Sequence, residues 1–214
     1  LSSSRSDTVG VFLEDISLPW AAEYLAGLER VLSRHGVDII PRATGGDPQQ
    51  RYNALSGLLS RRVDGFILFD NGPAPEADIP SVIVGPKREG GHTVSVDLGS
   101  AASQLARLAD GRAVELHQGE NPFFPGIGAL LPDDAPKKKG TVRLFDGLLP
   151  QEEGTSPDDT VVISATRRCP AVPPGAWKLY WPAFELGTLS ARLLLNIIQG
   201  KGVRPQVVSV LPAL

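Results

Sequence analysis

The chain has 214 residues, of which 42% are hydrophobic, 21% charged and 6% aromatic. These fractions are typical of a globular protein and exclude collagen-like, coiled-coil and fully disordered chains. The net charge of −3 gives no sign of the basic character expected of a nucleic-acid-binding domain. No apolar run is long enough to cross a membrane, so we expect no membrane partner.

The ends of the sequence and its sulfur-containing residues bear on where the protein works. Leu1–Asp7 lacks the apolar segment of a secretory signal, and the single cysteine, Cys169, has no partner for an internal disulfide. Both features are expected of a protein of the reducing cytoplasm. The sequence contains no Met, which is rare at this length, so we expect it to be part of a longer protein.

Strands and helices alternate over the first hundred residues. Apolar, β-branched runs predict strands at residues 8–13, 37–40, 63–69, 80–84 and 93–96. The first three begin at intervals close to the roughly 30 residues of a βαβ unit. This alternation predicts a parallel, doubly wound sheet with right-handed crossovers.

Two helices are predicted between the first three strands. The first begins at Pro19 and ends at Gly36. The second has Asp47 as its N-cap and Pro48 as its first residue. Its apolar side chains recur at helical spacing and are predicted to be buried; they are Tyr52, Leu55, Leu58 and Leu59.

The second half of the chain is less regular, with proline-containing loops between short elements. The expected elements are a helix at 100–108, strands at 113–116, 142–145 and 160–164, a helix from 183 to 200 and a strand at 206–210.

No group of residues has the spacing of a catalytic or metal-binding motif. Nucleophile elbows, HExxH, CxxC pairs and Walker loops are absent, and no GxGxxG follows the first strand. The three histidines, His35, His92 and His117, are scattered without ligand spacing, and Cys169 has no local His partner. We therefore predict no catalytic residue, no metal site and no cofactor, and expect that the protein is not an enzyme.

An ordered set of segments resembles a known family. The segments are TVGVFLEDISLPW (8–20), LSRRVDGFIL (59–68), IPSVIV (79–84), VSVD (94–97), PAFELG (182–187) and LLLNIIQG (193–200). In this order they resemble the effector-binding domain of the lac repressor and galactose repressor (LacI/GalR) family of bacterial transcription regulators. That domain shares its fold with periplasmic sugar-binding proteins. The resemblance covers about residues 5–110 and 157–214.

The resemblance implies an α/β fold of two doubly wound parallel-sheet lobes of the type I periplasmic-binding-protein class, joined by three crossovers. A small ligand would lie in the cleft between them. The lobes would be 8–97 plus 178–200 and, apparently shortened, 98–177 plus 203–214, after the end of a hinge at 1–7. The family further implies a homodimer that binds operator DNA through an N-terminal helix-turn-helix headpiece outside these residues.

The sequence departs from the family's pattern at positions that usually hold a sugar. Leu18 and Leu98 stand where Asn is common, and Gly85-Pro86 stands where Asp-Arg is usual. The family's Arg-containing stretch after the first strand of the second lobe and its Asn-Asp motif are not recognisable. These departures predict an effector other than an ordinary sugar, a site that has decayed, or segments missing from residues 110–160.

Ligands of open α/β sheets lie beyond the carboxyl ends of the strands, which selects the candidate residues. After the first strand come Asp15, Ser17 and Trp20. The Trp20 ring is predicted either to stack on a ligand or to belong to the helix core. After the third strand, Asp70 and Asn71 offer hydrogen-bonding groups or form a plain turn.

Two further candidates lie at the predicted crossovers. Asp97 ends the last strand of the first lobe and is predicted either to bind the ligand or to fix the hinge. Trp181 precedes Pro182 at the third crossover, close to Trp177, and either borders the ligand or packs between the lobes.

The function predicted from the resemblance is that of a repressor's sensor domain, which binds a sugar or related metabolite and changes the affinity of the dimer for operator DNA. The alternative is a periplasmic solute-binding protein of a transporter, with the same fold and no role on DNA. An enzyme ranks last, because a fold alone confers no activity.

Overall fold

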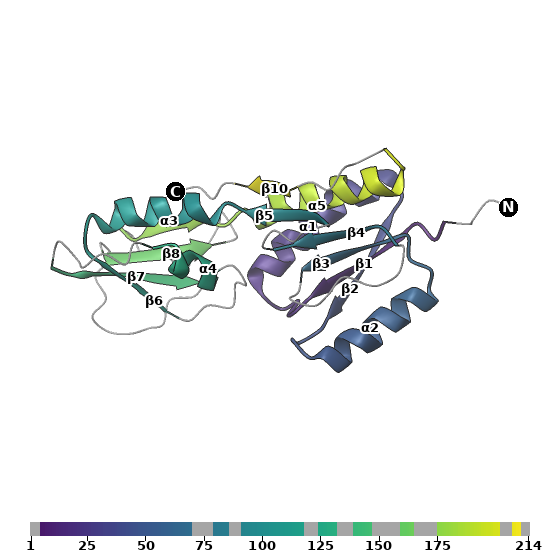
Figure 1. Ribbon diagram of the computed structural model, residues 1–214, viewed down its shortest axis with the longest axis horizontal. Helices are drawn as coiled ribbons and strands as arrows, with labels where there is room; N and C mark the ends of the chain where they lie inside the picture. The colour runs from purple at the N-terminus through teal and green to yellow at the C-terminus, as the bar shows by residue number, and fades with distance from the viewer. Residues whose placement is uncertain are drawn as a thin grey trace. The chain divides into compact units, whose positions relative to one another are not determined.

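The computed structural model describes residues 5–69, 79–85, 91–117, 124–131, 139–146, 159–164, 175–201 and 207–210. These residues form two units, each built on a parallel sheet (Figure 1). The first unit contains the chain up to Ser95 and the segment Ala183–Val210, and the second contains Val96–Pro182. The predicted α/β class with two parallel-sheet lobes is therefore confirmed.

The first unit has a six-stranded sheet with the order β10-β5-β4-β3-β1-β2. The strand pairs β1–β2, β1–β3, β3–β4 and β4–β5 are parallel, as predicted. The strands are β1 (Thr8–Leu13), β2 (Asp38–Ala43), β3 (Gly65–Phe69), β4 (Ser81–Val84), β5 (His92–Val96) and β10 (Val207–Val210).

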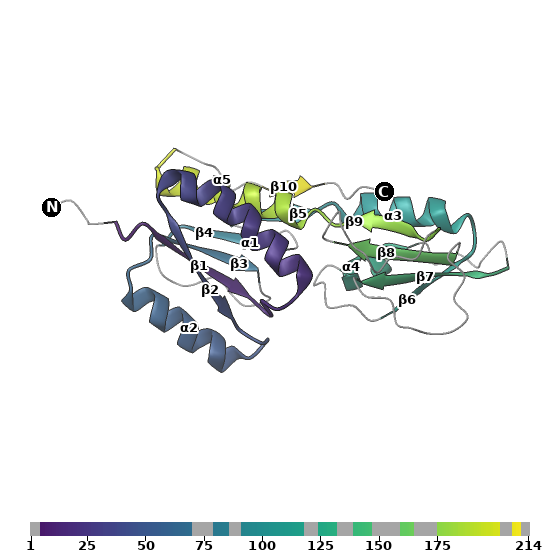
Figure 2. The same ribbon diagram turned by 180° about the vertical axis from the view of Figure 1, so that it is seen from behind.

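Helices cover both faces of this sheet. Helices α1 and α5 lie side by side along one face, and α2 lies along the other (Figures 1 and 2). This arrangement explains why β3 is buried along its whole length, since both of its faces are covered. The helices are α1 (Pro19–Leu32), continued by a 3-10 turn (Ser33–His35), α2 (Pro48–Ser60) and α5 (Ala183–Ile198).

The helix ends are where the turn chemistry predicts them. Pro19 begins α1, and Gly36 ends the following 3-10 turn with φ of 68°, a left-handed conformation that favours glycine. The side chain of Asp47 caps α2 by accepting a hydrogen bond from the Gln49 backbone N–H at 2.8 Å. These local signals place α1 and α2 without any tertiary information.

The face of the sheet covered by α2 holds an apolar cluster that contains one fully buried helix residue. Leu58 is 0% exposed, whereas Leu55 and Leu59 are partly buried at the edge of the cluster. Tyr52, predicted to be buried, is 65% exposed, so that part of the prediction is wrong. The buried members are Phe12, Leu58, Val63, Phe66, Leu68 and Ile83.

Two glycines set the distance between α1 and α5. A Cβ atom on Gly27 would lie 2.2 Å from the carbonyl oxygen of Phe184, and one on Gly187 would lie 2.2 Å from that of Tyr24. Real Cβ contacts are never this short, so the two backbones touch only because both positions lack a side chain. The packing joins helices that are some 150 residues apart in the chain.

The second unit has a four-stranded sheet with the order β6-β7-β8-β9, in which all neighbouring strands are parallel. The two helices of this unit, α3 and α4, contact each other, and α3 also contacts β6. An ion pair between Arg112 and Asp159 ties the start of β6 to the start of β8. The elements are α3 (Leu98–Ala109), β6 (Ala113–Leu116), α4 (Phe124–Ala129), β7 (Thr141–Asp146), β8 (Thr160–Ser164) and β9 (Trp177–Tyr180).

Two strands lie in the opposite unit from the one implied by the resemblance. Residues 178–200 were assigned to the first lobe, but β9 pairs with β8 in the second sheet. Residues 203–214 were assigned to the second lobe, but β10 is the edge strand of the first sheet. Both segments are short and apolar, and only their hydrogen-bonded neighbours distinguish the two sheets.

The segment before β1 is fastened to the first unit. Asp64 accepts hydrogen bonds from the backbone N–H groups of Ser6, at 3.3 Å, and Asp7, at 2.8 Å. The Arg5 guanidinium donates to the carbonyl oxygen of Ile198 at the end of α5, at 3.3 Å. Asp7 has φ of 51°, a left-handed conformation that Asp tolerates better than most residues.

Among the described helices, none combines the length and the apolar character needed to span a lipid bilayer.

The contact between α1 and α5 can be tested with glycine substitutions. We expect Gly187→Ala to lower the free energy of unfolding by about 2–3 kcal/mol or more, because the new methyl group overlaps backbone rather than a flexible side chain. Urea unfolding followed by circular dichroism measures the change.

Gly57 on α2 is the matched control, because a Cβ atom there has nothing within 4 Å. Gly57→Ala is expected to raise the free energy of unfolding by about 0.5–1 kcal/mol through helix propensity alone. Equal stability of the Gly57→Ala and Gly187→Ala variants would show that the helices do not require the close approach.

Candidate functional site

The carboxyl edge of the first sheet is level across its central strands. The register pairs Leu13 with both Ala43 and Phe69, so β1, β2 and β3 end together. Thr44, directly after β2, is 1% exposed and donates to the carbonyl oxygen of Leu13 from its backbone N–H, at 2.8 Å, and from Oγ1, at 3.2 Å. These hydrogen bonds fix the position of Leu13, the residue from which the β1–α1 loop begins.

Asp15 and Ser17 lie on this loop, and both are exposed. The backbone N–H of Ser17 donates to Oδ1 of Asp15 at 2.7 Å. This hydrogen bond lowers the pKa of Asp15, so the carboxylate is ionised at neutral pH. The pair presents a carboxylate and a hydroxyl to solvent at the edge where α/β sheets bind ligands.

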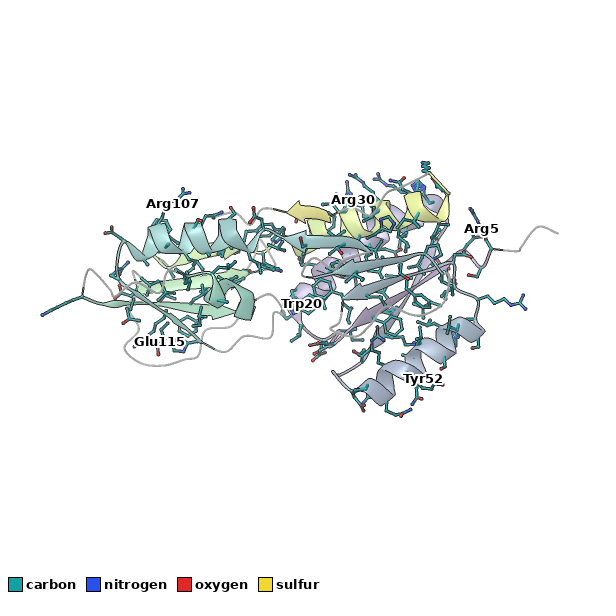
Figure 3. The ribbon with its side chains drawn as sticks, viewed as in Figure 1. Arg5, Trp20, Arg30, Tyr52, Arg107 and Glu115 are labelled. Atoms are coloured by element: carbon teal, nitrogen blue, oxygen red, sulfur yellow. The ribbon has the colours of Figure 1, made fainter. Side chains whose placement is uncertain are left out.

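Trp20 lies at the start of α1, at the same end of the unit (Figure 3). Its ring is 6% exposed and stacks on Phe69 with centroids 4.7 Å apart, and Tyr24 packs on Phe69 at 4.9 Å. Burial raises the pKa of the Tyr24 hydroxyl, which therefore stays protonated. Of the two interpretations offered by the sequence, the packing of these three rings favours a core residue.

The indole N–H of Trp20 has an unusual environment. Nε1 is buried, and within the described residues it has no hydrogen-bond acceptor. A buried donor without an acceptor costs about 1–3 kcal/mol and is rare in native proteins. Asp70 and Asn71, the candidates that follow Phe69 along the chain, lie outside the described residues.

The two remaining candidates belong to the second unit and have structural partners. Asp97 is the N-cap of α3, and its Oδ1 accepts a hydrogen bond from the Ser100 backbone N–H at 3.0 Å. Trp181 is 1% exposed, and its backbone N–H donates to the carbonyl oxygen of Ser164 at 2.8 Å. Asp97 therefore caps α3, and the Trp181 backbone extends the pairing of the second sheet by one residue beyond β9.

The carboxyl edge of the second sheet carries a residue that the sequence reasoning missed. His117 directly follows β6, and its backbone N–H donates to Leu144 of β7 at 2.9 Å. Its ring stacks on Phe145 with centroids 4.5 Å apart, and its side chain is 31% exposed. Nε2 lies 3.8 Å from a carboxylate oxygen of Glu115, too far for a hydrogen bond, and has no other partner among the described residues.

Ser164, at the end of β8, lies on the same edge and was also missed. The sequence contained the information needed to select them, because His117 directly follows one predicted strand and Ser164 ends another. The rule that selected Asp15 and Ser17 selects His117 and Ser164 when it is applied to the second sheet.

At the edge of the first sheet, Asp15 presents an ionised carboxylate and Ser17 a hydroxyl, and at the edge of the second sheet His117 presents an imidazole. Such groups donate to and accept from hydroxyl groups, and they suit a polyhydroxylated ligand. Within the described ranges, no three His, Cys, Asp or Glu side chains are grouped so that they could hold a metal ion.

Comparison with known proteins agrees with this architecture. Residues 6–88 match the family described as "Periplasmic binding proteins and sugar binding domain of LacI family". Among curated proteins, catabolite control protein A from Staphylococcus xylosus is 31% identical over 114 residues. That alignment covers 49% of this chain and 35% of the relative, so the similarity spans about a third of the relative's length.

Solved structures with the same fold cover nearly all of this chain. A LacI transcriptional regulator from Lactobacillus brevis has a TM-score of 0.76 and 16% identity, covering 96% of this chain and 98% of its own. The transcriptional regulator CelR, in complex with cellobiose, has a TM-score of 0.73 and 20% identity, covering 100% and 84%. CcpA of Lactococcus lactis has a TM-score of 0.73 and 16% identity, covering 96% of both chains. Residues 6–88 are thus similar to the sugar-binding domain of the LacI family, and the chain shares its two-lobed α/β fold with solved LacI-family regulators.

Proposed function

We propose that this chain is the effector-binding domain of a bacterial transcription regulator, and that it binds a small polyhydroxylated molecule at the carboxyl edge of its first sheet. The observation that carries the proposal is the family match over residues 6–88, which contains β1 to β4 and the loop with Asp15 and Ser17. The matched region thus includes the exposed polar edge of the first unit.

The chemistry of this edge supports a sugar or a related metabolite. A carboxylate such as that of Asp15 accepts hydrogen bonds from two neighbouring hydroxyls of a saccharide, and the Ser17 hydroxyl both donates and accepts. The CelR structure was determined with cellobiose, so a protein of this fold holds a saccharide.

The relatives support a regulator rather than a solute-binding protein. Matching curated proteins include catabolite control proteins, and the similar structures include LacI-family transcription regulators. In this proposal the protein is a cytoplasmic homodimer, and a helix-turn-helix that precedes these residues contacts operator DNA. The effector changes DNA affinity only to the extent that it binds the two conformations of the dimer with different affinities.

Ligand binding is tested first on the 214-residue chain with a panel of mono- and disaccharides that includes cellobiose. A saccharide at about 100 times its Kd adds about 2.7 kcal/mol of stability, which corresponds to a rise in Tm of about 5–10 °C. Asp15→Asn is expected to weaken binding about tenfold or more, as for loss of a hydrogen bond to a charged group. Isothermal titration calorimetry measures the affinity.

Asp38→Asn is the matched control, because Asp38 is an exposed carboxylate at the opposite, amino-terminal edge of the same sheet. It should leave the affinity unchanged. A panel with no thermal shift, or equal losses in the two variants, would contradict the proposed ligand edge.

Two substitutions of Asp97 distinguish a role in helix capping from a role in ligand binding. Asp97→Ala should lower the free energy of unfolding by about 1 kcal/mol, and Asp97→Ser, which keeps a capping oxygen, by much less. Both variants should bind the saccharide as the unchanged chain does, because the Asp97 carboxylate is engaged by Ser100. A loss of affinity in Asp97→Ser at unchanged stability would instead make Asp97 a ligand-binding residue.

The regulatory role is tested on the full-length gene product. We expect a mobility-shift assay with the DNA upstream of its own gene to show specific binding that the saccharide identified above strengthens or weakens. Absence of DNA binding with and without that saccharide would favour the solute-binding alternative.

A further inference from the structure

A basic cavity lies in the first unit, away from the carboxyl edge. It has a volume of about 190 Å³ and is lined by Arg30, Val31, Arg34, His35, Thr188 and Arg192. Helix α1 follows β1 and runs back along the sheet, so its last turn lies toward the amino ends of the strands. The cavity is therefore distinct from the ligand edge of the proposed function.

Three guanidinium groups converge on this cavity from two helices. Arg30 lies in the last turn of α1, Arg34 lies four residues later in the 3-10 turn that follows, and Arg192 comes from the middle of α5. None of the six lining residues is acidic. Within the described part of the chain, no ion pair or side-chain hydrogen bond engages these three arginines, and all three are exposed (Figure 3 labels Arg30).

The dipole of α1 explains only part of this arrangement. A helix C-terminus favours cations, which accounts for single basic residues such as Arg30 or His35. Arg192 lies far from the end of α5 and gains nothing from that effect. Like charges four residues apart on a helix repel each other, and a third guanidinium beside them adds to the repulsion. The protein as a whole has a net charge of −3, so the positive charge of these three arginines is opposite in sign to that of the whole chain.

We propose that this cavity binds the phosphate group of a small phosphomonoester. A guanidinium presents planar, paired N–H donors that match phosphate oxygens, and a dianion would relieve the repulsion among three such groups. The buried side chain of Val31, 9% exposed, forms an apolar part of the lining that can contact the carbon atoms of the ester. The cavity volume suits a small molecule rather than a polymer.

The experiment uses the 214-residue chain in a phosphate-free buffer of low ionic strength. Inorganic phosphate, glycerol 3-phosphate and glycerol are titrated in parallel, with sodium chloride at matched ionic strength as the screening control. Nuclear magnetic resonance follows the backbone amides. Both phosphate compounds should give saturable shifts at residues 30–35 and 188–192, while glycerol and chloride give none.

Arginine variants test the assignment of the site. Arg192→Gln should weaken phosphate binding about tenfold, as expected for loss of a charged hydrogen bond, and the double variant Arg30→Gln, Arg34→Gln should abolish the saturable shifts. Arg107→Gln is the matched control, because Arg107 is an exposed arginine in the last turn of α3 in the second unit. It should leave the phosphate affinity unchanged.

Thermal unfolding shows whether each variant is folded. Arg192→Gln should unfold at or above the Tm of the unchanged chain when phosphate is absent, because it removes like-charge repulsion and no interaction with a helix dipole. Phosphate should raise the Tm of the unchanged chain and of Arg107→Gln equally, raise that of Arg192→Gln less at the same concentration, and leave that of the double variant unchanged. Shifts that chloride reproduces, shifts outside residues 30–35 and 188–192, or equal weakening by Arg107→Gln would overturn the proposal.

Discussion

The contact of α1 with α5 through Gly27 and Gly187 is the constraint on which the first unit depends. It packs α1, which follows β1, against α5, which comes after the whole second unit in the sequence. The same packing covers one face of the sheet and holds α1 where Trp20 and Tyr24 reach Phe69. The first unit is therefore complete only when residues 183–198 have returned to it, a non-local step that slows folding relative to local helix formation.

Local sequence signals predict the helices and strands of this protein well, but they do not predict which strands pair with each other. The cap formed by Asp47 and the left-handed glycine at Gly36 depend on a few neighbouring residues, and both ends are confirmed. The exposure of Tyr52 could not be read from helical spacing, because it depends on how much of the sheet α2 covers. The assignments of β9 and β10 failed for the same kind of reason, since a four-residue apolar strand carries no mark of its partner.

The candidate site shows why residue type alone is a weak guide to binding. Asp15 and Asp97 both accept a backbone hydrogen bond from a residue two or three positions later. Asp15 is exposed at the carboxyl edge and keeps acceptor capacity, whereas Asp97 is half-buried and caps a helix. Trp20 has the aromatic ring expected of a sugar platform, but the ring faces Phe69 in the core. Exposure, which the sequence does not encode locally, separates these roles.

The fastening of residues 5–7 has a mechanical consequence. The contacts of this segment are with Asp64 before β3 and with Ile198 at the end of α5, both in the first unit. Any domain joined upstream of Arg5 is thus tethered to one lobe at a point on the amino side of its strands. The orientation of such a domain is therefore set by the first lobe, to which residues 5–7 are hydrogen-bonded. The hydrogen bonds to the Asp64 carboxylate limit how far the segment before β1 can move relative to this lobe.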